Sequence, residues 1–171
     1  MEQEQRAYSR VAAQLRAHGR RCDSPDGPPL FRTATRRDGS TLAARLSTTS
    51  MPEGLVDFLV EMDTKLDQIL AGQRQDLIRQ DFPLELDVRE ISGAGVRFRS
   101  EEPLADGQIL EVVIVLTQFP LRLASAIGRV RGIEDGLHRF EFTHIREHDL
   151  ESIVQFVFQE QREEIRNRKW S

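Results

Sequence analysis

The sequence predicts a mainly β fold with flanking helices: a small antiparallel barrel, a C-terminal helix and a long inserted helix. Three observations carry this prediction. From residue 82 onwards, apolar and polar residues alternate in short runs, which is the period of half-buried strands. Between residues 52 and 79 apolar residues recur every three or four positions instead. The same helical period returns after residue 148, at the end of the chain.

Length, composition and charge limit the possible functions. The 171 residues suit one domain with an embellishment or two very small domains, and they are enough to bury a core. The chain is 39% hydrophobic and 30% charged, which is ordinary for a soluble globular protein. Its formal net charge of -4 argues against general binding of nucleic-acid polymers. A few local arginines still suffice to hold one small anionic ligand.

The sequence also bears on location. The single cysteine, Cys22, excludes a disulfide within the chain, and its turn-rich surroundings favour a loop cysteine over a catalytic thiol. The first ten residues, MEQEQRAYSR, are too polar for a signal peptide. The longest apolar run, ILEVVIVL, contains a glutamate and has the length of a strand rather than of a membrane span. We therefore expect a cytoplasmic protein without a membrane-spanning segment.

The N-terminal third has weak patterns. Residues 11–18 fit a short strand or a helical turn. Residues 19–50 are rich in Gly, Pro, Ser and Thr, and they include the turn sequence SPDGPP at 24–29. We expect a loop here, with at most a short strand or helical turn.

Residues 52–79 predict a long helix, with Pro52 at a first-turn position. A heptad stripe runs along it, formed by Leu55, Leu59, Met62, Leu66 and Ile69. Such a stripe either packs on its own domain or pairs with the same helix of other chains as a short coiled coil. Further apolar residues lie outside the stripe, namely Val56, Phe58, Val60 and Leu70. A helix that is apolar on more than one side is usually buried on more than one side, which favours a homo-oligomer.

The second half predicts strands at hairpin spacing. Alternating runs at 84–89, 96–99, 109–117, 121–134 and 138–145 are separated by turn residues, with Gly128 at a bulge or bend and a hairpin at Glu134-Asp135-Gly136. An antiparallel meander of this kind closes, or nearly closes, into a small barrel. The final helix has an apolar stripe and a basic end, and His148 or Asp149 is its expected cap.

Catalytic patterns are missing from the sequence. It contains no phosphate-binding loop and no nucleophile elbow, and the four histidines, at 18, 138, 144 and 148, are too dispersed to predict a metal site. The carboxylates are abundant, but they are not arranged with a base, a nucleophile or metal ligands. We expect a protein that is not an enzyme and that needs no cofactor.

Two short motifs, an arginine pair and a serine–glycine segment, follow each other along the chain. Two arginines four residues apart, Arg6 and Arg10, precede the first strand, and the segment Glu90-Ile91-Ser92-Gly93-Ala94-Gly95 joins two later strands. This arrangement resembles the PilZ domain, a bacterial receptor for cyclic di-GMP that is marked by RxxxR and [D/N]xSxxG segments. The resemblance covers residues 6–18 and 82–168 and implies a six-stranded, split-barrel-like fold.

The resemblance also implies a division of the chain. Residues 1–22 would form the N-terminal arm and first strand, residues 23–80 an inserted loop and heptad helix, and residues 81–171 the remaining barrel and C-terminal helix. Some PilZ proteins with a helical insertion of this kind are oligomers, so the resemblance adds to the expectation of a homo-oligomer.

The resemblance further implies a set of cyclic di-GMP contacts: Arg6, Arg10, Glu90, Ser92, Gly93 and Gly95. Arginine forks can grip a phosphodiester or stack on guanine, and a serine hydroxyl can meet a phosphate oxygen. The glycine either lets the backbone and the ligand approach closely or supplies a positive φ. Glu90 departs from the family pattern, because it is one methylene longer than the usual aspartate, and Gln5 replaces an arginine that many members have.

Two functional hypotheses are compatible with the sequence. The first is a non-catalytic cyclic di-GMP receptor that signals to an unknown downstream protein. The alternative is a nucleotide-independent oligomeric scaffold built by the 52–79 helix.

Overall fold

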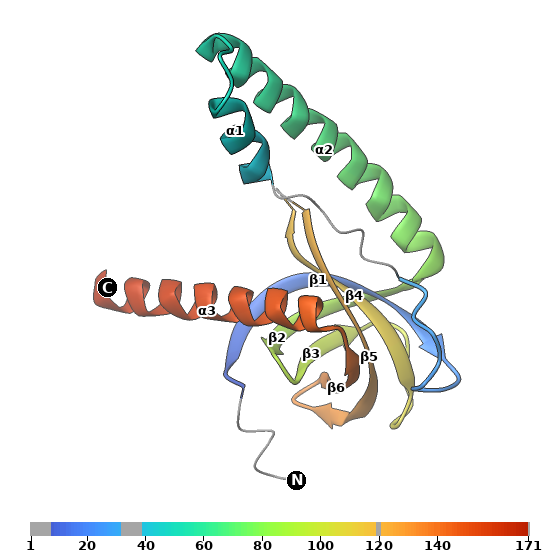
Figure 1. Ribbon diagram of the computed structural model, residues 1–171. Coiled ribbons are helices and arrows are strands. Elements are labelled where there is room, and N and C mark those ends of the chain that lie inside the picture. The colour runs from blue at the N-terminus through green and yellow to red at the C-terminus, as the bar shows by residue number, and fades with distance from the viewer. Residues whose placement is uncertain (1–7, 32–38, 119–120, 171) are drawn as a thin grey trace.

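The computed structural model describes residues 8–31, 39–118 and 121–170 of the chain (Figure 1). In this part of the chain six strands form a barrel, and three helices lie outside it. The elements in chain order are β1 (Arg10–Cys22), α1 (Gly39–Ser47), α2 (Glu53–Asp81), β2 (Leu84–Ser92), β3 (Gly95–Ser100), β4 (Ile109–Gln118), β5 (Leu121–Glu134), β6 (Leu137–Ile145) and α3 (Glu147–Trp170).

The predicted antiparallel barrel is confirmed, and it is closed. The strand order is β1-β2-β3-β6-β5-β4, and β1 completes the ring by pairing with both β2 and β4. All of the pairings are antiparallel. Because every strand has two neighbours, the barrel leaves no long unpaired edge. The helical insertion lies between β1 and β2, which are adjacent in the barrel.

The barrel interior is filled by alternate residues of all six strands. Helix α3 lies across the barrel and adds Ile153 and Val157 to the same core (Figure 1). Fully buried members from the strands are Val88, Phe98, Leu110, Ile114 and Ala124. Burial of one such aliphatic or aromatic side chain contributes roughly 1.5–3 kcal/mol, so this core is the main source of stability.

A second, smaller core lies outside the barrel and attaches the insertion. Strand β4 is buried on both faces, and its outward residues Val113 and Val115 pack with Phe31, Ile78 and Phe82. The rings of Phe31 and Phe82 meet edge to face, with their centroids 6.3 Å apart. Phe31 precedes helix α1 and Phe82 follows helix α2, so both ends of the helical part of the insertion are held at the same place on the barrel.

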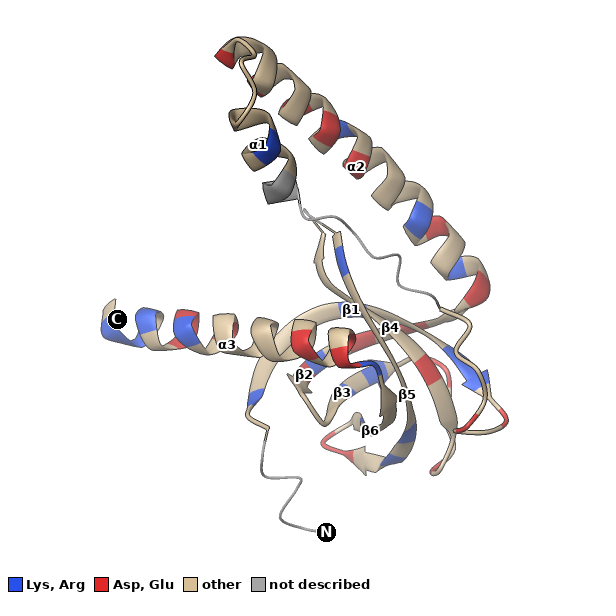
Figure 2. Ribbon diagram, in the orientation of Figure 1, with Lys and Arg blue, Asp and Glu red and all other residues tan. Residues whose placement is uncertain are grey.

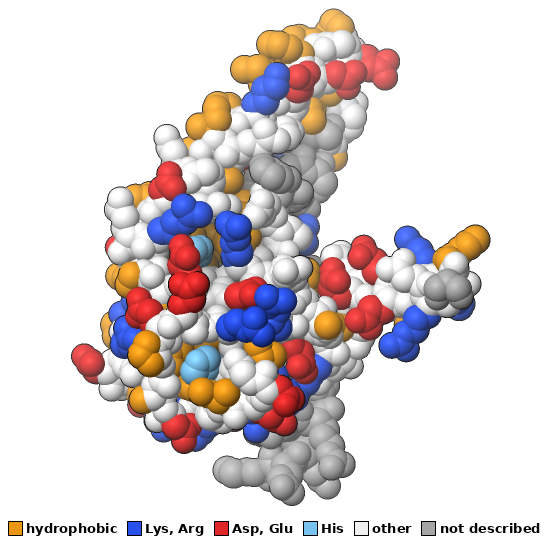
Figure 3. All heavy atoms as spheres, turned by 180° about the vertical axis from the view of Figure 1, so that it is seen from behind, with side chains coloured by type: hydrophobic (Ala, Val, Ile, Leu, Met, Phe, Trp, Pro, Cys, Tyr) orange, Lys and Arg blue, Asp and Glu red, His pale blue; other side chains and the backbone are white. Residues whose placement is uncertain are grey.

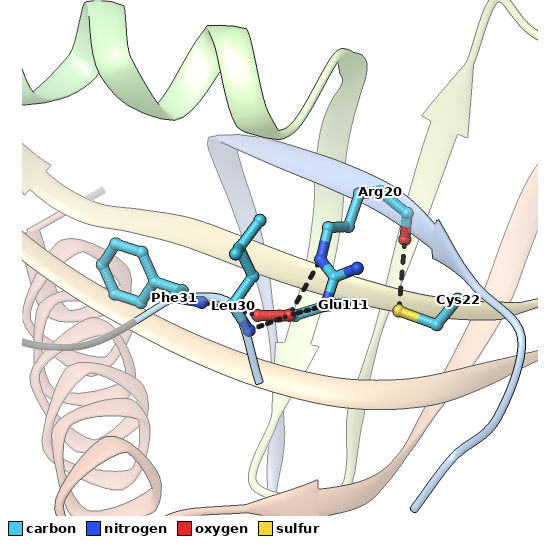
Figure 4. Close-up of polar contacts among 5 residues, drawn as sticks. All are labelled: Arg20, Cys22, Leu30, Phe31 and Glu111. Atoms are coloured by element: carbon cyan, nitrogen blue, oxygen red, sulfur yellow. Dashed lines mark hydrogen bonds and ion pairs between the residues drawn. The ribbon is translucent and has the colours of Figure 1, made fainter. Parts of the chain in front are cut away.

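A buried carboxylate fixes the loop that leads into the insertion (Figure 4). Glu111 of β4 is only 1% exposed, and it accepts two hydrogen bonds from Arg20, at 2.7 and 3.0 Å. Its oxygens also accept from the backbone N–H groups of Leu30 and Phe31, at 2.8 and 2.9 Å. A buried charge is tolerated only when it is paired and hydrogen-bonded, and Glu111 meets both conditions.

The helix predicted at 52–79 is confirmed as α2, which projects from the barrel together with α1 (Figure 1). Pro52 is the N-cap residue rather than part of the first turn. Val56 and Val60 on one side are partly buried, and α1 packs against this helix. An apolar stripe on another side is exposed, made of Leu55, Phe58, Met62, Leu66, Ile69, Leu70 and Leu77. The view from behind shows hydrophobic side chains at intervals along the projecting part (Figure 3).

Several expected boundaries were wrong. The first strand runs over thirteen residues instead of 11–18, because pairing with both β2 and β4 stabilises a segment whose own pattern is weak. Residues 39–47, expected as loop with at most a short strand or helical turn, form the nine-residue helix α1. The last helix begins at Glu147, before either expected cap, and the N–H of Leu150 donates to the carbonyl of Arg146 at 2.9 Å. Asp149 is instead a buried residue of the first turn.

Two expected glycine features of the strands are confirmed. Asp135 and Gly136 both have positive φ, at 55° and 76°, as a two-residue hairpin turn between β5 and β6 requires. The β5–β6 register shifts at Gly128, where an added Cβ would meet the backbone of Glu141. Both signals are local, which explains why they can be read from the sequence.

Candidate functional site

A cavity of about 500 Å³ lies where the start of β1 meets the β2–β3 turn and strands β3, β5 and β6. Figure 2 shows Lys and Arg segments on the strands of this side of the barrel, beneath α3. The polar lining consists of Tyr8, Arg10, Glu90, Ser92, Arg97, Arg131, Arg139 and Glu141. Apolar side chains such as Phe142, Ile145 and Leu150 complete it. The cavity volume falls within the roughly 300–1,000 Å³ that is usual for small-molecule sites.

The β2–β3 turn forms one wall of the cavity. Ser92 and Gly95 are paired across it, with Gly93 and Ala94 at its tip. The Ser92 hydroxyl accepts from the N–H of Ala94 at 3.1 Å and donates to the carbonyl of Gly95 at 3.3 Å. The second bond is long for a hydroxyl donor, whose usual range is about 2.5–3.0 Å. Ser92 therefore holds the turn, and its weaker bond is the one that a better acceptor can replace.

The two glycines of this turn serve close packing rather than a left-handed backbone. The positive-φ glycines of the described chain are Gly107, Gly132 and Gly136, so neither Gly93 nor Gly95 belongs to them. A Cβ on Gly95 would collide with the backbone oxygen of Phe140 on β6. A Cβ on Gly93 would overlap the ring of Tyr8. Positive φ is therefore not the reason for glycine at these two positions, and the space of the missing side chains is filled by Phe140 and Tyr8.

Glu90 lies between two arginines at the mouth of the cavity. Its oxygens are 4.0 Å from Nη1 of Arg10 and 3.8 Å from Nη1 of Arg97. Glu90 is the cross-strand partner of Ala12 on β1 and of Arg97 on β3, and the register shifts beside both pairs. Such bulges re-aim side chains, and they are common next to functional sites. The Glu90 side chain is 29% exposed and that of Arg10 is 49% exposed, so solvent reaches this ion pair.

Further arginines give the cavity a positive balance. Arg97 and Arg139 are direct cross-strand partners on β3 and β6, and Nε of Arg131 lies 3.2 Å from Glu141. Four arginines and two glutamates therefore line the cavity. The lining carries two more positive charges than negative ones, which suits an anionic ligand with about two negative charges.

The predicted site residues that are described are brought together. Arg10, Glu90, Ser92, Gly93 and Gly95 all line the cavity. Arg10 was expected on an arm before the first strand, but it is the first residue of β1 and pairs with Ser92. This pairing fixes the backbone of Arg10 beside the turn. Arg6 lies outside the described residues.

Sequence reasoning missed five polar lining residues: Tyr8, Arg97, Arg131, Arg139 and Glu141. Arg97 carried a signal, because it alternates with the buried residues Val96 and Phe98 and so points away from the core. The other two arginines are adjacent to it only through the pairing of β3, β5 and β6. That pairing order cannot be read from the local pattern.

Other candidate sites stay unremarkable. The part of the chain that the structure describes holds no group of three or more potential metal ligands. Burial raises the pKa of the Cys22 thiol, so its reactive thiolate is disfavoured. Within the described ranges, no helix has both the length and the apolar character to cross a lipid bilayer.

Solved structures of other proteins are similar to this fold. None of the curated protein sequences matches the chain. Among solved structures, a pathogenic protein from Xanthomonas campestris is similar at 20% identity and a TM-score of 0.53, covering 93% of this chain and 91% of that one. It is described as a tetrameric PilZ domain that self-assembles via a helical bundle. At this identity the similarity concerns the fold.

Two further structures are more distant. The inhibitor of motility from Bacillus subtilis is 13% identical with a TM-score of 0.48, over 91% of this chain and 50% of that one. The PilZ domain of CeSA from a cellulose-synthesizing bacterium is 10% identical with a TM-score of 0.42, over 88% and 96% of the two chains.

A family model identifies the domain from the sequence itself. The model of the PilZ domain matches residues 70–159, which include the β2–β3 turn and the arginines of β3, β5 and β6. Strand β1, with Arg10, precedes the matched range. The match covers more than half of the 171 residues, and the chain therefore belongs to the PilZ domain family.

Proposed function

We propose that this protein is a non-catalytic receptor for cyclic di-GMP that passes the binding event to a protein partner. PilZ domains are generally receptors or adaptors for this nucleotide. The observation that carries the proposal is the convergence of Arg10, the β2–β3 turn and three further arginines on one cavity. The proposal places the protein in the bacterial cytoplasm, where this messenger acts.

The chemistry of the ligand supports the proposal. Cyclic di-GMP carries two phosphodiester charges and two guanines, and the described lining has a surplus of two positive charges. Arginine grips a phosphate through two parallel N–H bonds, and its plane can stack on a guanine. The apolar part of the lining, with Phe142 and Leu150, offers further contact to the bases.

Each predicted contact has a role in this proposal. Arg6 and Arg10 bind phosphate or guanine, and the Ser92 hydroxyl exchanges its long bond to Gly95 for one to a phosphate oxygen. The Glu90 carboxylate accepts from guanine N–H groups. Gly93 and Gly95 leave room for the Tyr8 ring and the Phe140 backbone, which brings the start of β1, the turn and β6 together around the ligand. No cofactor or metal takes part.

Isothermal titration calorimetry with cyclic di-GMP tests the receptor function. We expect the wild type to bind and Arg10→Ala to bind at least about tenfold more weakly, because charge-assisted hydrogen bonds are lost. Arg21→Ala is a matched control, since Arg21 is an exposed β1 arginine that pairs with Glu102 at 3.3 Å. A well-folded wild type that gives no heat would show the proposal to be wrong.

A second candidate function is an oligomeric scaffold assembled through α2. The observation in its favour is the exposed apolar stripe on α2, whose seven residues are 41–60% exposed. Patches of this kind on an ordered helix usually mark an interface. The helical bundle of the Xanthomonas protein supports assembly here too. Leu59 is the one member of the predicted heptad that is half-buried, and helical spacing places it on the same side as the stripe.

Sedimentation equilibrium tests the assembly. We expect the wild type to sediment as an oligomer and Leu59→Asp/Leu66→Asp as a monomer, because charges do not fit an apolar interface. Thr64→Asp/Gln68→Asp adds the same charge at exposed positions on the other side of the helix, and it should leave the oligomer intact. If the wild type is already a monomer, the scaffold function is excluded, and the receptor function is still open to the titration.

A further inference from the structure

The environment of Glu90 suggests how the nucleotide site is controlled. The two oxygens of this carboxylate face different arginines, Oε1 toward Arg10 and Oε2 toward Arg97. Both arginines line the cavity. A carboxylate in this place carries the same charge as a phosphodiester, and both groups accept hydrogen bonds from arginine. It therefore stands where a phosphate of the ligand would be attracted.

The distances show that these contacts are easily exchanged. Direct bonds between guanidinium and carboxylate are about 2.7–2.9 Å long. The 3.8 and 4.0 Å separations at Glu90 are longer, whereas Arg20 and Glu111 of the same barrel are 2.7 Å apart. Glu90 thus neutralises part of the charge on the arginines without occupying their best hydrogen-bonding geometry. A ligand that supplies that geometry can displace it.

Arg97 is held ready for such an exchange. Its Nη1 faces Glu90, while its Nη2 lies 3.4 Å from Glu134 in the β5–β6 hairpin region. The side chain is 23% exposed, so most of it is already immobilised. If Glu90 turns away, Glu134 still orients the guanidinium. Arg10, Glu90 and Arg97 lie on the neighbouring strands β1, β2 and β3, and this pairing fixes the spacing of their backbones.

We propose that Glu90 is an internal counterion that competes with the anionic ligand for Arg10 and Arg97, and that Arg97 is a further phosphate-binding residue. The proposal rests on the receptor function, because it concerns the same cavity. On binding, the phosphodiester oxygens replace the carboxylate on the two arginines, and Glu90 turns to the guanine edge. Glu90 thereby lowers the affinity of the site for the nucleotide. Replacing Glu90 should therefore change that affinity.

Calorimetric titration of the full chain with cyclic di-GMP tests this exchange in four variants. Glu90→Gln should bind several-fold more tightly than the wild type, because the competing charge is lost while an acceptor oxygen remains. Arg97→Ala should bind about tenfold more weakly. In Glu90→Gln/Arg97→Ala the gain from the glutamine should shrink, because part of the competition acts through Arg97. Glu102→Gln makes the same charge change beside Arg21, and it should leave the affinity unchanged.

The outcomes separate this inference from the receptor function. If the wild type binds and Glu90→Gln binds more weakly, Glu90 is a plain ligand contact and the counterion role is overturned. If folded wild type and Glu90→Gln both give no heat, the receptor function itself is overturned, and the inference with it. If only Glu90→Gln binds, Glu90 blocks the site in the natural chain: the counterion role is supported, and the receptor function of the natural chain is overturned. Circular dichroism of each variant establishes that it is folded.

Discussion

The two ends of strand β1 use the same pair of residue types in opposite ways. At one end Arg10 and Glu90 are 4.0 Å apart and open to solvent. At the other end Arg20 and Glu111 are 2.7 Å apart, and the carboxylate is 1% exposed. Glu111 also receives two backbone N–H groups, which complete its hydrogen bonding (Figure 4). The difference lies in what covers the carboxylate, not in the chemistry of the pair.

This difference separates a structural ion pair from an exchangeable one. A buried, fully bonded pair fixes a local structure, and losing one partner leaves a charge without compensation. A solvent-exposed pair contributes little to stability, so its partners can be redirected to a ligand at little cost. The Arg20 end therefore anchors the insertion, and the Arg10 end is suited to binding.

The largest expected effect is at the buried end. Glu111→Gln should lower the free energy of unfolding by about 3–5 kcal/mol, because Arg20 and two backbone N–H groups lose their anionic partner. Urea denaturation followed by circular dichroism measures this change. The control is Glu102→Gln, which breaks a different ion pair that is exposed to solvent. It should change the free energy of unfolding by less than about 0.5 kcal/mol. Equal effects at the two positions would contradict the distinction.

The next effect concerns the backbone frame of the open end. Gly95→Ala should destabilise the protein by about 1–3 kcal/mol, because the new Cβ meets the backbone oxygen of Phe140, which cannot move freely. Gly72→Ala is the matched control: nothing lies within 4 Å of its added Cβ in mid-helix, so alanine should be neutral or stabilising by about 1 kcal/mol. Thermal unfolding distinguishes the two. If Gly95→Ala leaves the stability unchanged, the contact between β3 and β6 at Phe140 is loose enough to accept a Cβ.

A pH dependence should appear near the buried end. Burial, and secondly the charge of Arg79, lower the pKa of His18 below its ordinary value, while Glu85 opposes the shift. The stabilising contribution of neutral His18 is complete above the unfolded pKa of about 6.5. It is lost as the pH falls from there through the lower pKa of the folded state.

Urea titrations between pH 7.5 and pH 5 measure this loss of stability. The decrease should be smaller in His18→Gln, which has no proton to bind. A profile that is identical in His18→Gln and the wild type would exclude His18 as the cause.

A small effect on stability is expected at the open end. Arg10→Ala should change the free energy of unfolding by no more than about 1 kcal/mol, because exposed ion pairs contribute at most that much. The same chemical denaturation experiment measures it. A loss as large as that of Glu111→Gln would show that Arg10 is structural, and any loss of nucleotide binding by Arg10→Ala could then reflect unfolding.

The smallest expected effect is a gain in affinity. Glu90→Asp restores the family's usual residue and shortens the side chain by one methylene. The shorter carboxylate should bridge Arg10 and Arg97 less well and keep its reach to the turn, so cyclic di-GMP should bind a few-fold more tightly. Calorimetry of the folded variant measures this, and a weaker complex would contradict it.

The parts of the fold that could be predicted from sequence are those with local causes. The 3.6-residue period gave α2, the two-residue period gave the later strands, and Asp135-Gly136 gave its hairpin. The first strand escaped because its long-range partners, rather than its own pattern, stabilise it. The motif found one wall of the cavity. Arg131 and Arg139 could not be found, because only the pairing order of β3, β6 and β5 brings them there.

The double burial of β4 has an evolutionary consequence. The outward residues Val113 and Val115 are covered by Phe31, Ile78 and Phe82, which belong to the segment between β1 and β2. A descendant that lost this segment would expose the apolar outer face of β4 to solvent. A descendant that kept the segment but had a polar outer face on β4 would lose the packing that attaches the segment to the barrel. The inserted segment and the outer face of β4 are therefore expected to have changed together. Related chains with a short β1–β2 connection should carry polar side chains at the positions of Val113 and Val115.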